Sequence, residues 1–256
     1  MLLGGCQSGR VPVPGKIVSN NPCVDAVLAE IAEPNAIGAV SSYSQVSGSA
    51  SAPLAWARQF PAIGSGAEDI IAAKPRLALI GQYGAVAALD RAGINYVAFG
   101  VPATIEESIA QVRAIGKLTG REASADRLAR HIDDAAKVIV SRRPRSAIIW
   151  LSGGFVPGGG TLQDAMLGRA GFQNASAHYG LTAWSVLPLE ALLKDPPDVI
   201  FTPVKAQGAD ARALGLRFRL LERLAKRPQI IPFSETLLNC GGPSIIEVMS
   251  LLRGAA

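Results

Sequence analysis

The sequence predicts an α/β protein with two lobes, each built on a parallel sheet, joined by one long α-helix. Short runs of β-branched residues alternate with amphipathic segments along most of the chain, which is the pattern of parallel α/β structure. Residues 121–143, near the middle of the chain, keep a helical period instead. The α/β alternation then begins a second time, and this restart indicates a second lobe.

The composition is that of a folded, water-exposed chain. Its 256 residues reach the length at which single cores stop growing, and 49% of them are hydrophobic while 18% are charged. The net charge is +5, but the basic residues are scattered and carry no aromatic interleaving, so nucleic-acid binding is not expected. No apolar run approaches the 18 residues or so that a bilayer-spanning helix needs.

Residues 12–120 are assigned to the N-terminal lobe. Asn21 is suited to cap a helix whose first position is Pro22. Leu77 to Ile80 form a continuous apolar run, which is typical of a strand covered on both faces. The expected strands are 16–18, 37–40, 77–80 and 96–99, the expected helices are 23–31, 86–91 and 104–118, and residues 41–53 are expected to form a loop.

Residues 121–143 are assigned to the interlobe helix, because apolar residues recur at helical spacing from Leu128 to Ile139 and Pro144 ends the pattern. Residues 144–256 form the C-terminal lobe. Its expected elements are a strand at 147–151, a glycine-rich turn at 153–160, a helix at 162–170, strands at 199–201 and 230–231, and a closing helix at 245–252.

Residues 1–11 are expected to be a tail that contains Leu3-Gly4-Gly5-Cys6, which has the order of a bacterial lipobox with Cys6 as the lipidated residue. No basic region or apolar stretch of an export signal precedes it, so either the numbering begins inside a longer precursor or the match is coincidental. With Cys6 set aside, Cys23 and Cys240 remain. They are either a disulfide formed in an oxidising compartment or two buried thiols.

A similar segment occurs once in each lobe: Ala67 to Leu77 and Leu189 to Val199. Each reads as a short helix with a glutamate in its first turn, a proline that ends it, and an apolar strand. The two copies resemble the signature of the helical-backbone class of periplasmic substrate-binding proteins, the family of iron-siderophore, cobalamin and haem ABC importers that includes vitamin B12-binding proteins. The resemblance runs from about residue 12 to 253, although Arg76 stands where the family has an acidic residue.

The resemblance implies a function without catalysis or a cofactor. The chain would be the substrate-binding component of an ABC importer, capturing a metal chelate such as cobalamin, a ferric siderophore or haem in a cleft between the lobes. It would act as a periplasmic monomer, attached to the membrane only through a lipid on Cys6, and would deliver its ligand to an ABC permease dimer. Glu68 and Glu190 would dock on the permease, or else only cap their helices. Relatives also pair cysteines in turns like those of Cys23 and Cys240, which implies a disulfide.

Cobalamin-binding members have an aromatic residue six positions before each docking glutamate. Trp184 stands there before Glu190, whereas Ala62 stands there before Glu68. Trp184 either stacks on the ligand or packs in the core of its lobe. Ligands of open parallel sheets gather at the carboxyl ends of the strands. The other candidate ligand contacts follow predicted strands: Asn21, Tyr43, Gln82, Tyr83 and Phe155.

The chain has only two histidines, so few imidazole groups are available to act as a base or to coordinate a metal. His178 and Tyr179, shortly before Trp184, either complete the coordination of a chelated iron or form a loop pair without a ligand role. No cluster of His, Asp and Cys has the spacing of a zinc or manganese site, so no metal site is expected.

The glycine-rich segment 153–160 supports an alternative function. It lies between a strand and a helix, where phosphate-binding loops occur, and would make the chain a nucleotide- or phosphate-binding α/β enzyme. Its spacing matches neither the P-loop nor the dinucleotide fingerprint, and the chain lacks a Gly-x-Ser-x-Gly motif, so we expect no enzyme. A third class, an interaction module without a small ligand, would show no stabilisation by any ligand.

Overall fold

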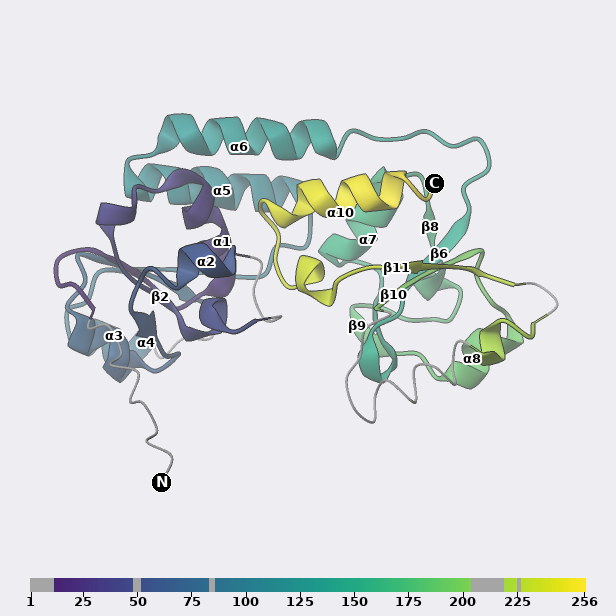
Figure 1. Cartoon of the computed structure of the whole chain (residues 1–256), viewed down its shortest axis with the longest axis horizontal. Coiled ribbons are helices and arrows are strands. Elements are labelled where there is room, and N and C mark those ends of the chain that lie inside the picture. The colour runs from purple at the N-terminus through teal and green to yellow at the C-terminus, as the bar shows by residue number, and fades with distance from the viewer. Residues whose placement is uncertain (1–11, 48–51, 83–85, 204–218, 225–226) are drawn as a thin grey trace, which may run out of the picture. The chain divides into compact units, whose positions relative to one another are not determined.

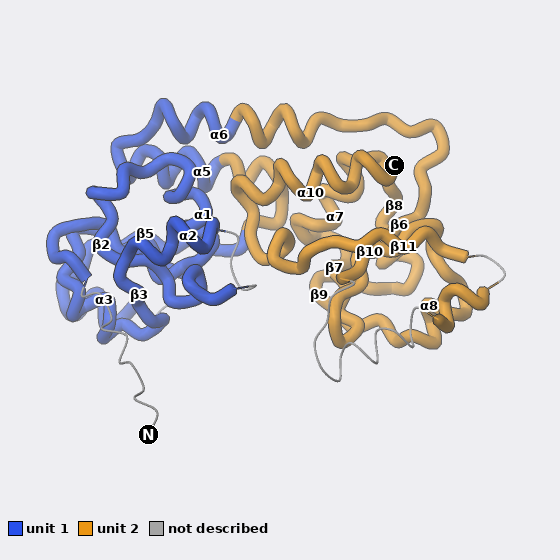
Figure 2. The backbone as a smooth tube through the Cα atoms, viewed as in Figure 1, with its two compact units in different colours: residues 1–101, 110–129 blue, residues 102–109, 130–256 orange. Residues whose placement is uncertain are grey.

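The computed structural model describes residues 12–47, 52–82, 86–203, 219–224 and 227–256 (Figure 1). The chain divides into two compact units: unit 1 comprises residues 1–101 and 110–129, and unit 2 comprises residues 102–109 and 130–256 (Figure 2). Cys6, Tyr83 and part of the expected 41–53 loop lie outside the described residues. The lobe boundaries expected at residues 120 and 144 stay a prediction.

Unit 1 is built on a five-stranded sheet in the order β3-β2-β1-β4-β5, and every neighbouring pair is parallel. The register places Ile17 opposite both Ile37 and Leu77, and Ala78 opposite Tyr96. The parallel sheet expected for this part of the chain is confirmed. Its strands are β1 (Ile17–Ser19), β2 (Ile37–Ser41), β3 (Ala62–Ile63), β4 (Leu77–Gly81) and β5 (Tyr96–Phe99).

Helices bury both faces of this sheet, which explains why its central strands are continuous apolar runs. Val18, Ala78 and Ile80 share one buried face with residues of α3 and α4. Alternate residues such as Ile17 and Leu79 are equally buried on the other face. The helices are α1 (Pro22–Ile31), α2 (Leu54–Ala57), α3 (Ala67–Ala73) and α4 (Val86–Arg91), with short 3-10 segments η1 (Pro34–Ala36) and η2 (Ser42–Gln45). The expected loop after β2 therefore begins with one turn of helix.

Helices α5 (Ile105–Thr119) and α6 (Glu122–Ala135) follow, and the division between the units falls within each of them. The predicted helix over residues 121–143 is wrong beyond Ala135, where α6 ends. Beyond Ala136 the chain carries three β-branched residues in succession, which are poor helix formers. The backbone N–H of Ile139 donates to the carbonyl of Arg169 at 2.9 Å, whereas Val138 and Val140 point to solvent. A tertiary backbone hydrogen bond replaces the helical one.

Unit 2 contains a four-stranded parallel sheet in the order β11-β10-β6-β8 and a two-stranded antiparallel ribbon of β7 and β9. The predicted glycine-rich turn 153–160 is wrong in part, because its central residues form β7. The strands are β6 (Ser146–Ile149), β7 (Phe155–Pro157), β8 (Gln173–Asn174), β9 (Trp184–Val186), β10 (Val199–Thr202) and β11 (Gln229–Pro232); the helices are α7 (Leu162–Arg169), α8 (Leu189–Lys194) and α10 (Ser244–Arg253), with 3-10 segments η3 (Ser152–Gly154), η4 (Ala175–Ala177) and η5 (Glu235–Leu238).

The sheet of unit 2 is also covered on both faces. On one face Ile148 and Trp150 pack with Val156 of the ribbon and Leu192 of α8. On the other, Phe201 meets Phe172 edge to face at a centroid distance of 5.6 Å, and α7 packs against α10. This layering fixes the ribbon and α8 on the same side of the unit.

Cys23 and Cys240 form a disulfide, as the family resemblance implied. Cys23 lies in the first turn of α1 and Cys240 lies shortly before α10. Among the described residues, no helix combines the length and apolar character needed to cross a membrane.

Candidate functional site

The carboxyl ends of the five parallel strands share one edge of the unit 1 sheet, and two asparagines tie that edge together. Asn20 accepts a hydrogen bond from the N–H of Gly81 (3.3 Å) and donates to the carbonyl of Ser65 (3.4 Å). Asn21 caps α1 by accepting from the N–H of Cys23 at 2.9 Å, as predicted, and donates to the carbonyl of Phe99 at 3.4 Å. Both polar atoms of Asn21, a predicted ligand contact, therefore have partners within unit 1.

The same edge exposes apolar and amide side chains. Tyr43, on η2 immediately after β2, is 57% exposed, and Val46 and Val101 are also largely exposed. Gln82 directly follows β4, and its side chain lies over Gly100, the residue after β5. The structure thus brings Tyr43 and Gln82 to the same edge of the sheet. Val46 and Val101 were not predicted, because single exposed valines give no signal in a sequence.

In unit 2, the antiparallel ribbon carries two exposed aromatic side chains. Its register pairs Phe155 with Val186 and Pro157 with Trp184, so these four residues lie on one face. Phe155 is 50% exposed, Trp184 46% and Val186 52%. Val156 points the opposite way and is fully buried. We call this exposed face of Phe155, Trp184 and Val186 the aromatic ribbon.

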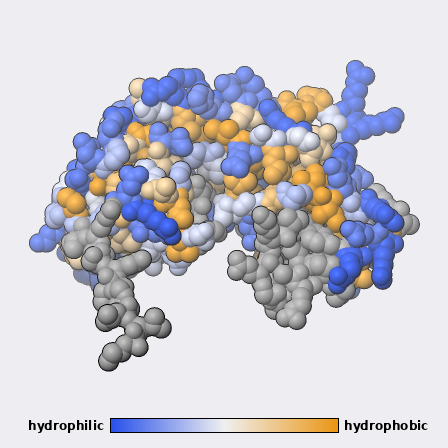
Figure 3. Space-filling view, viewed as in Figure 1, coloured by the Kyte–Doolittle hydropathy of each residue, from blue (hydrophilic) through white to orange (hydrophobic). Residues whose placement is uncertain are grey.

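The alternative that Trp184 packs in the core is wrong. Phe155 and Trp184, both predicted ligand contacts, are brought together on the aromatic ribbon. Val186 was missed, although the alternation Trp184-Ser185-Val186 is a detectable signal for a strand with one apolar face. On the face of the molecule shown in Figure 3, hydrophilic residues dominate the rim and hydrophobic residues are exposed in patches.

The glycine-rich segment has a structural explanation in the ribbon. A Cβ at Gly158 would lie 2.6 Å from the carbonyl oxygen of Ala183, which accepts a hydrogen bond from the N–H of Gly158. Gly154 has a φ of +83°, a left-handed conformation that favours glycine, and its carbonyl accepts from the N–H of Leu187. The glycines allow β7 to approach the chain of β9 closely.

A phosphate site at the start of α7 is not supported. Two of the backbone donors that a phosphate would use there already have acceptors within the segment. Thr161 caps the helix by accepting from the N–H of Asp164 at 3.2 Å, and Asp164 accepts from the N–H of Gly160 at 3.1 Å. Asp164 would also place a negative charge beside any bound anion.

The two glutamates of the repeated segment occupy matching positions. Glu68 lies in the first turn of α3 and Glu190 in the first turn of α8, and both are exposed. Each helix lies between a short strand and a central parallel strand of its sheet: β3 and β4 in unit 1, β9 and β10 in unit 2. Within the described part of the chain, neither glutamate forms an ion pair.

His178 and Tyr179 lie at the opposite, amino edge of the unit 2 sheet, beside a cavity of about 340 Å³. The Nε2 atom of His178 is 2.7 Å from Oδ2 of Asp195, and the Tyr179 hydroxyl donates to the Asp195 carbonyl at 2.5 Å. Burial, and then the charge of Asp195, raises the pKa of Tyr179 to about 12. Both side chains anchor the C-terminal end of α8. They are not brought to the aromatic ribbon.

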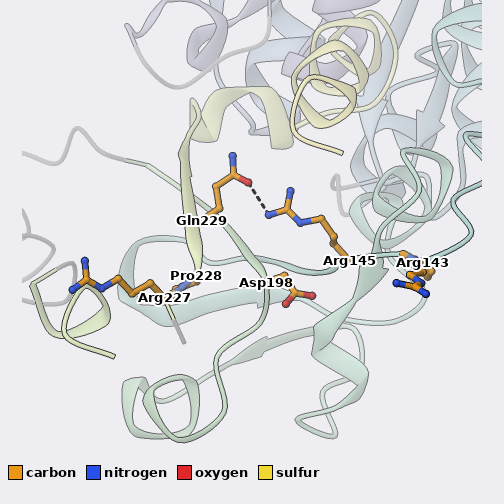
Figure 4. Close-up of a pocket in the computed structure, with 7 residues that line it drawn as sticks. Arg143, Arg145, Asp198, Arg227, Pro228 and Gln229 are labelled. Carbon is orange, nitrogen blue, oxygen red and sulfur yellow. Dashed lines mark hydrogen bonds between the residues drawn. The ribbon is translucent and has the colours of Figure 1, made fainter. Parts of the chain in front are cut away.

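A second cavity on the amino edge, of about 540 Å³, is lined by Arg143, Arg145, Asp198, Arg227 and Gln229 (Figure 4). Arg145 donates to Gln229 at 2.7 Å and to the carbonyl of Ala255 at 3.0 Å. Figure 4 shows the side chain of Arg227 pointing away from Arg145. Asp198 accepts from both the N–H and the hydroxyl of Ser146. Because the guanidinium groups do not converge, this cavity is part of the scaffold. The described residues contain no group of three or more potential metal ligands.

This architecture is that of a periplasmic binding protein. The sequence pattern of that family matches residues 17–215, and the chain belongs to it. It is 28% identical over 215 residues to a cobalamin-binding protein of Halobacterium salinarum, covering 79% of this chain and 58% of that relative. The chain thus spans little more than half the length of the curated relatives it matches.

Solved structures of similar proteins show the same fold. The periplasmic heme-binding protein RhuT from Roseiflexus sp. RS-1 superposes with a TM-score of 0.72 at 22% identity, covering 94% of this chain and 99% of that one. The periplasmic heme-binding protein HutB of Vibrio cholerae gives 0.72 at 20% identity, covering 94% and 98%. A protein of an Fe3+-hydroxamate transport system from Saccharomonospora viridis gives 0.66 at 18%, covering 95% and 93%.

Proposed function

We propose that this chain is the substrate-binding component of an ABC importer and captures a metal chelate with large apolar faces: cobalamin, haem or a ferric siderophore. The observation that carries the proposal is the aromatic ribbon. Phe155 and Trp184 are held side by side on a two-stranded antiparallel element, with about half of each side chain open to solvent. Large planar or macrocyclic ligands bind to such surfaces because rigid aromatic rings lose little conformational entropy on binding.

The exposed edge of unit 1 supplies a second surface of the same character, through Tyr43, Val46 and Val101. The amide of Gln82 adds a hydrogen-bonding group beside them. Ligand sites commonly combine a mostly apolar lining with a few polar groups that fix orientation. Among the relatives reported above, one is a cobalamin-binding protein and two are heme-binding proteins, which fits the choice of chelates.

The test is a thermal-shift and calorimetric screen of the purified chain against cyanocobalamin, haem and several ferric siderophores, with ATP and NAD as controls for a nucleotide-binding enzyme. A ligand at a hundredfold excess over its Kd should stabilise the chain by about 2.7 kcal/mol. We expect a chelate to give this shift and both nucleotides to give none. A shift with ATP or NAD alone would instead make the glycine-rich segment the site.

We further propose that Glu68 and Glu190 dock the loaded protein on a permease dimer. Both are exposed, both lie in the first turn of a short helix, and neither has an ion-pair partner in the described part of its unit. Replacing both with alanine should leave chelate binding intact and abolish uptake into vesicles that carry the cognate permease. Glu122→Ala, which removes an exposed first-turn glutamate of α6, is the matched control. Loss of chelate binding in the double variant would contradict this division of roles.

A lipid on Cys6 is the proposed membrane attachment, supported by the lipobox order of Leu3-Gly4-Gly5-Cys6. Expressed with an export signal, the wild type should fractionate with membranes, and Cys6→Ser should appear in the periplasmic extract. Equal fractionation of the two would show that Cys6 does not anchor the chain.

A further inference from the structure

A buried carboxyl group lies under the turn that carries Tyr43. Asp25, in the first turn of α1, is completely buried. Its Oδ2 atom accepts hydrogen bonds from the backbone N–H of Ser41 at 2.9 Å and from the hydroxyl of Ser44 at 2.6 Å. Ser19, the last residue of β1, supplies a further side-chain hydrogen bond. One side chain thus joins α1 to the ends of β1 and β2 and to η2.

The same turn is fixed from its other side. Gln45 donates from Nε2 to the carbonyls of Ala57 (3.1 Å) and Phe60 (2.9 Å). The hydroxyl oxygen of Ser41 accepts from the N–H of Tyr43 at 3.3 Å. Tyr43 is therefore exposed on a turn that is held to the interior of unit 1 through Ser41, Ser44 and Gln45.

Packing alone does not account for a carboxyl group at this position. An acidic residue in the first turn of a helix is favoured by the helix dipole, but an exposed one provides that benefit without desolvation. Asp25 is fully desolvated, and its Oδ1 atom has no hydrogen-bond partner among the described residues. A buried group with this cost in stability is typical of a functional role.

We propose that Asp25 is a positioning residue for ligand binding, which holds the turn Ser41–Gln45 in the conformation that presents Tyr43 at the exposed edge of unit 1. This inference rests on the proposed function. Asp25 itself does not touch the ligand. It acts through its hydrogen bonds to Ser41 and Ser44.

The position also makes the turn sensitive to pH. Burial raises the pKa of Asp25 from 3.8 to about 7, while the hydrogen bonds from the three serines lower it less. Opening the turn would return the carboxyl group to water and to its ordinary pKa, so ionisation favours the open turn. Ligand affinity should therefore weaken as the pH rises towards about 7 and should level off above it.

Among the described residues, no charged group is a cause of this shift. Of the elements packed against α1, β1 and β2 carry no charged or titratable side chain. The η2 turn carries the phenol of Tyr43, and Arg58 ends α2. Arg121 bonds to the carbonyl of Ile31, at the other end of α1. None of these groups contributes to the pKa shift of Asp25.

The experiment compares Asp25→Ala, Asp25→Asn and Ser44→Ala. Ser42→Ala is the control, because Ser42 lies in the same turn and its hydroxyl makes no hydrogen bond to any other described residue. Calorimetry with haem and with cyanocobalamin gives Kd at pH 6 and pH 8, and hydrogen exchange gives the opening constant of the amides of residues 42–46. Asp25→Ala should raise Kd about tenfold or more, since it leaves two buried donors without an acceptor. Asp25→Asn keeps one acceptor oxygen and should restore binding.

In the wild type, the opening constant of the turn should rise about tenfold from pH 6 to pH 8, and in Asp25→Asn it should stay constant. The positioning role is overturned if Asp25→Ala binds the probes as tightly as wild type, or if Asp25→Asn keeps the wild-type pH dependence. Should Asp25→Ala fail to fold, Ser44→Ala tests the same hydrogen bond, and wild-type affinity in Ser44→Ala then overturns the positioning role. If no variant and not even the wild type binds either probe, the proposed function fails for these chelates, and the opening constants alone still decide whether Asp25 holds the turn.

Discussion

Removing the indole of Trp184 is the sharpest test of the aromatic ribbon. Trp184 is 46% exposed on the same face as Phe155 and Val186. A tryptophan side chain can bury up to about 250 Å², so roughly 100 Å² of this ring is available to a ligand. At about 25 cal/mol per Å², covering that area contributes about 2.5 kcal/mol. Trp184→Ala should therefore raise Kd for the bound chelate roughly 50- to 100-fold.

Isothermal titration calorimetry is the appropriate assay, because the substitution also removes a fluorophore. Trp184→Phe, which keeps an aromatic face, should recover most of the lost affinity. Val140→Ala, which trims an exposed apolar side chain far from the ribbon in sequence, is the control and should leave Kd unchanged. A folded Trp184→Ala variant that binds the chelate within about twofold of wild type would refute the ribbon as a ligand surface.

Three further predictions concern stability. Because burial raises the pKa of Asp25 from 3.8 to about 7, the folded chain keeps a proton that the unfolded chain releases; the free energy of unfolding, relative to Asp25→Asn, should fall by about 4 kcal/mol between about pH 4 and pH 7, and denaturant titrations that show it rising would contradict the assignment. Replacing Cys23 and Cys240 by serine opens a loop of over two hundred residues and should cost up to about 4–5 kcal/mol; an unchanged Tm would argue against this. Gly158→Ala forces a Cβ against the carbonyl of Ala183 and should lower both Tm and chelate affinity, whereas retention of both would show that the ribbon tolerates the clash.

Much of the fold could be predicted from local pattern. The strand Tyr96–Phe99 and the helix Val86–Arg91 have the predicted bounds, and the cap of α1 by Asn21 followed from residue type alone. Such features depend on short-range chemistry: β-branched runs, apolar periodicity and side-chain caps. The end of α6 was missed although three successive β-branched residues follow it, and the backbone hydrogen bond from Ile139 to Arg169 that replaces the helical one has a partner distant in sequence.

The candidate site was predictable only in part. Phe155 and Trp184 were found separately, one as a residue after a strand and the other by its spacing from Glu190. Their presence on one face follows from the register of β7 and β9, which no local pattern fixes. The role of Asp25 was missed altogether, because an acidic residue in a first helical turn looks like an ordinary exposed one.

The sequence by itself determined the α/β class, the order of most strands and helices, the two glutamate-led segments and the identity of the residues at strand ends. Each of these is set by neighbours within one or two turns of chain. Only the tertiary structure decided which side chains are buried and which share a surface, because burial and strand register depend on segments that meet from distant parts of the sequence. Asp25 shows the difference: its residue type was visible in the sequence, but its desolvation and its three serine partners exist only in the folded chain.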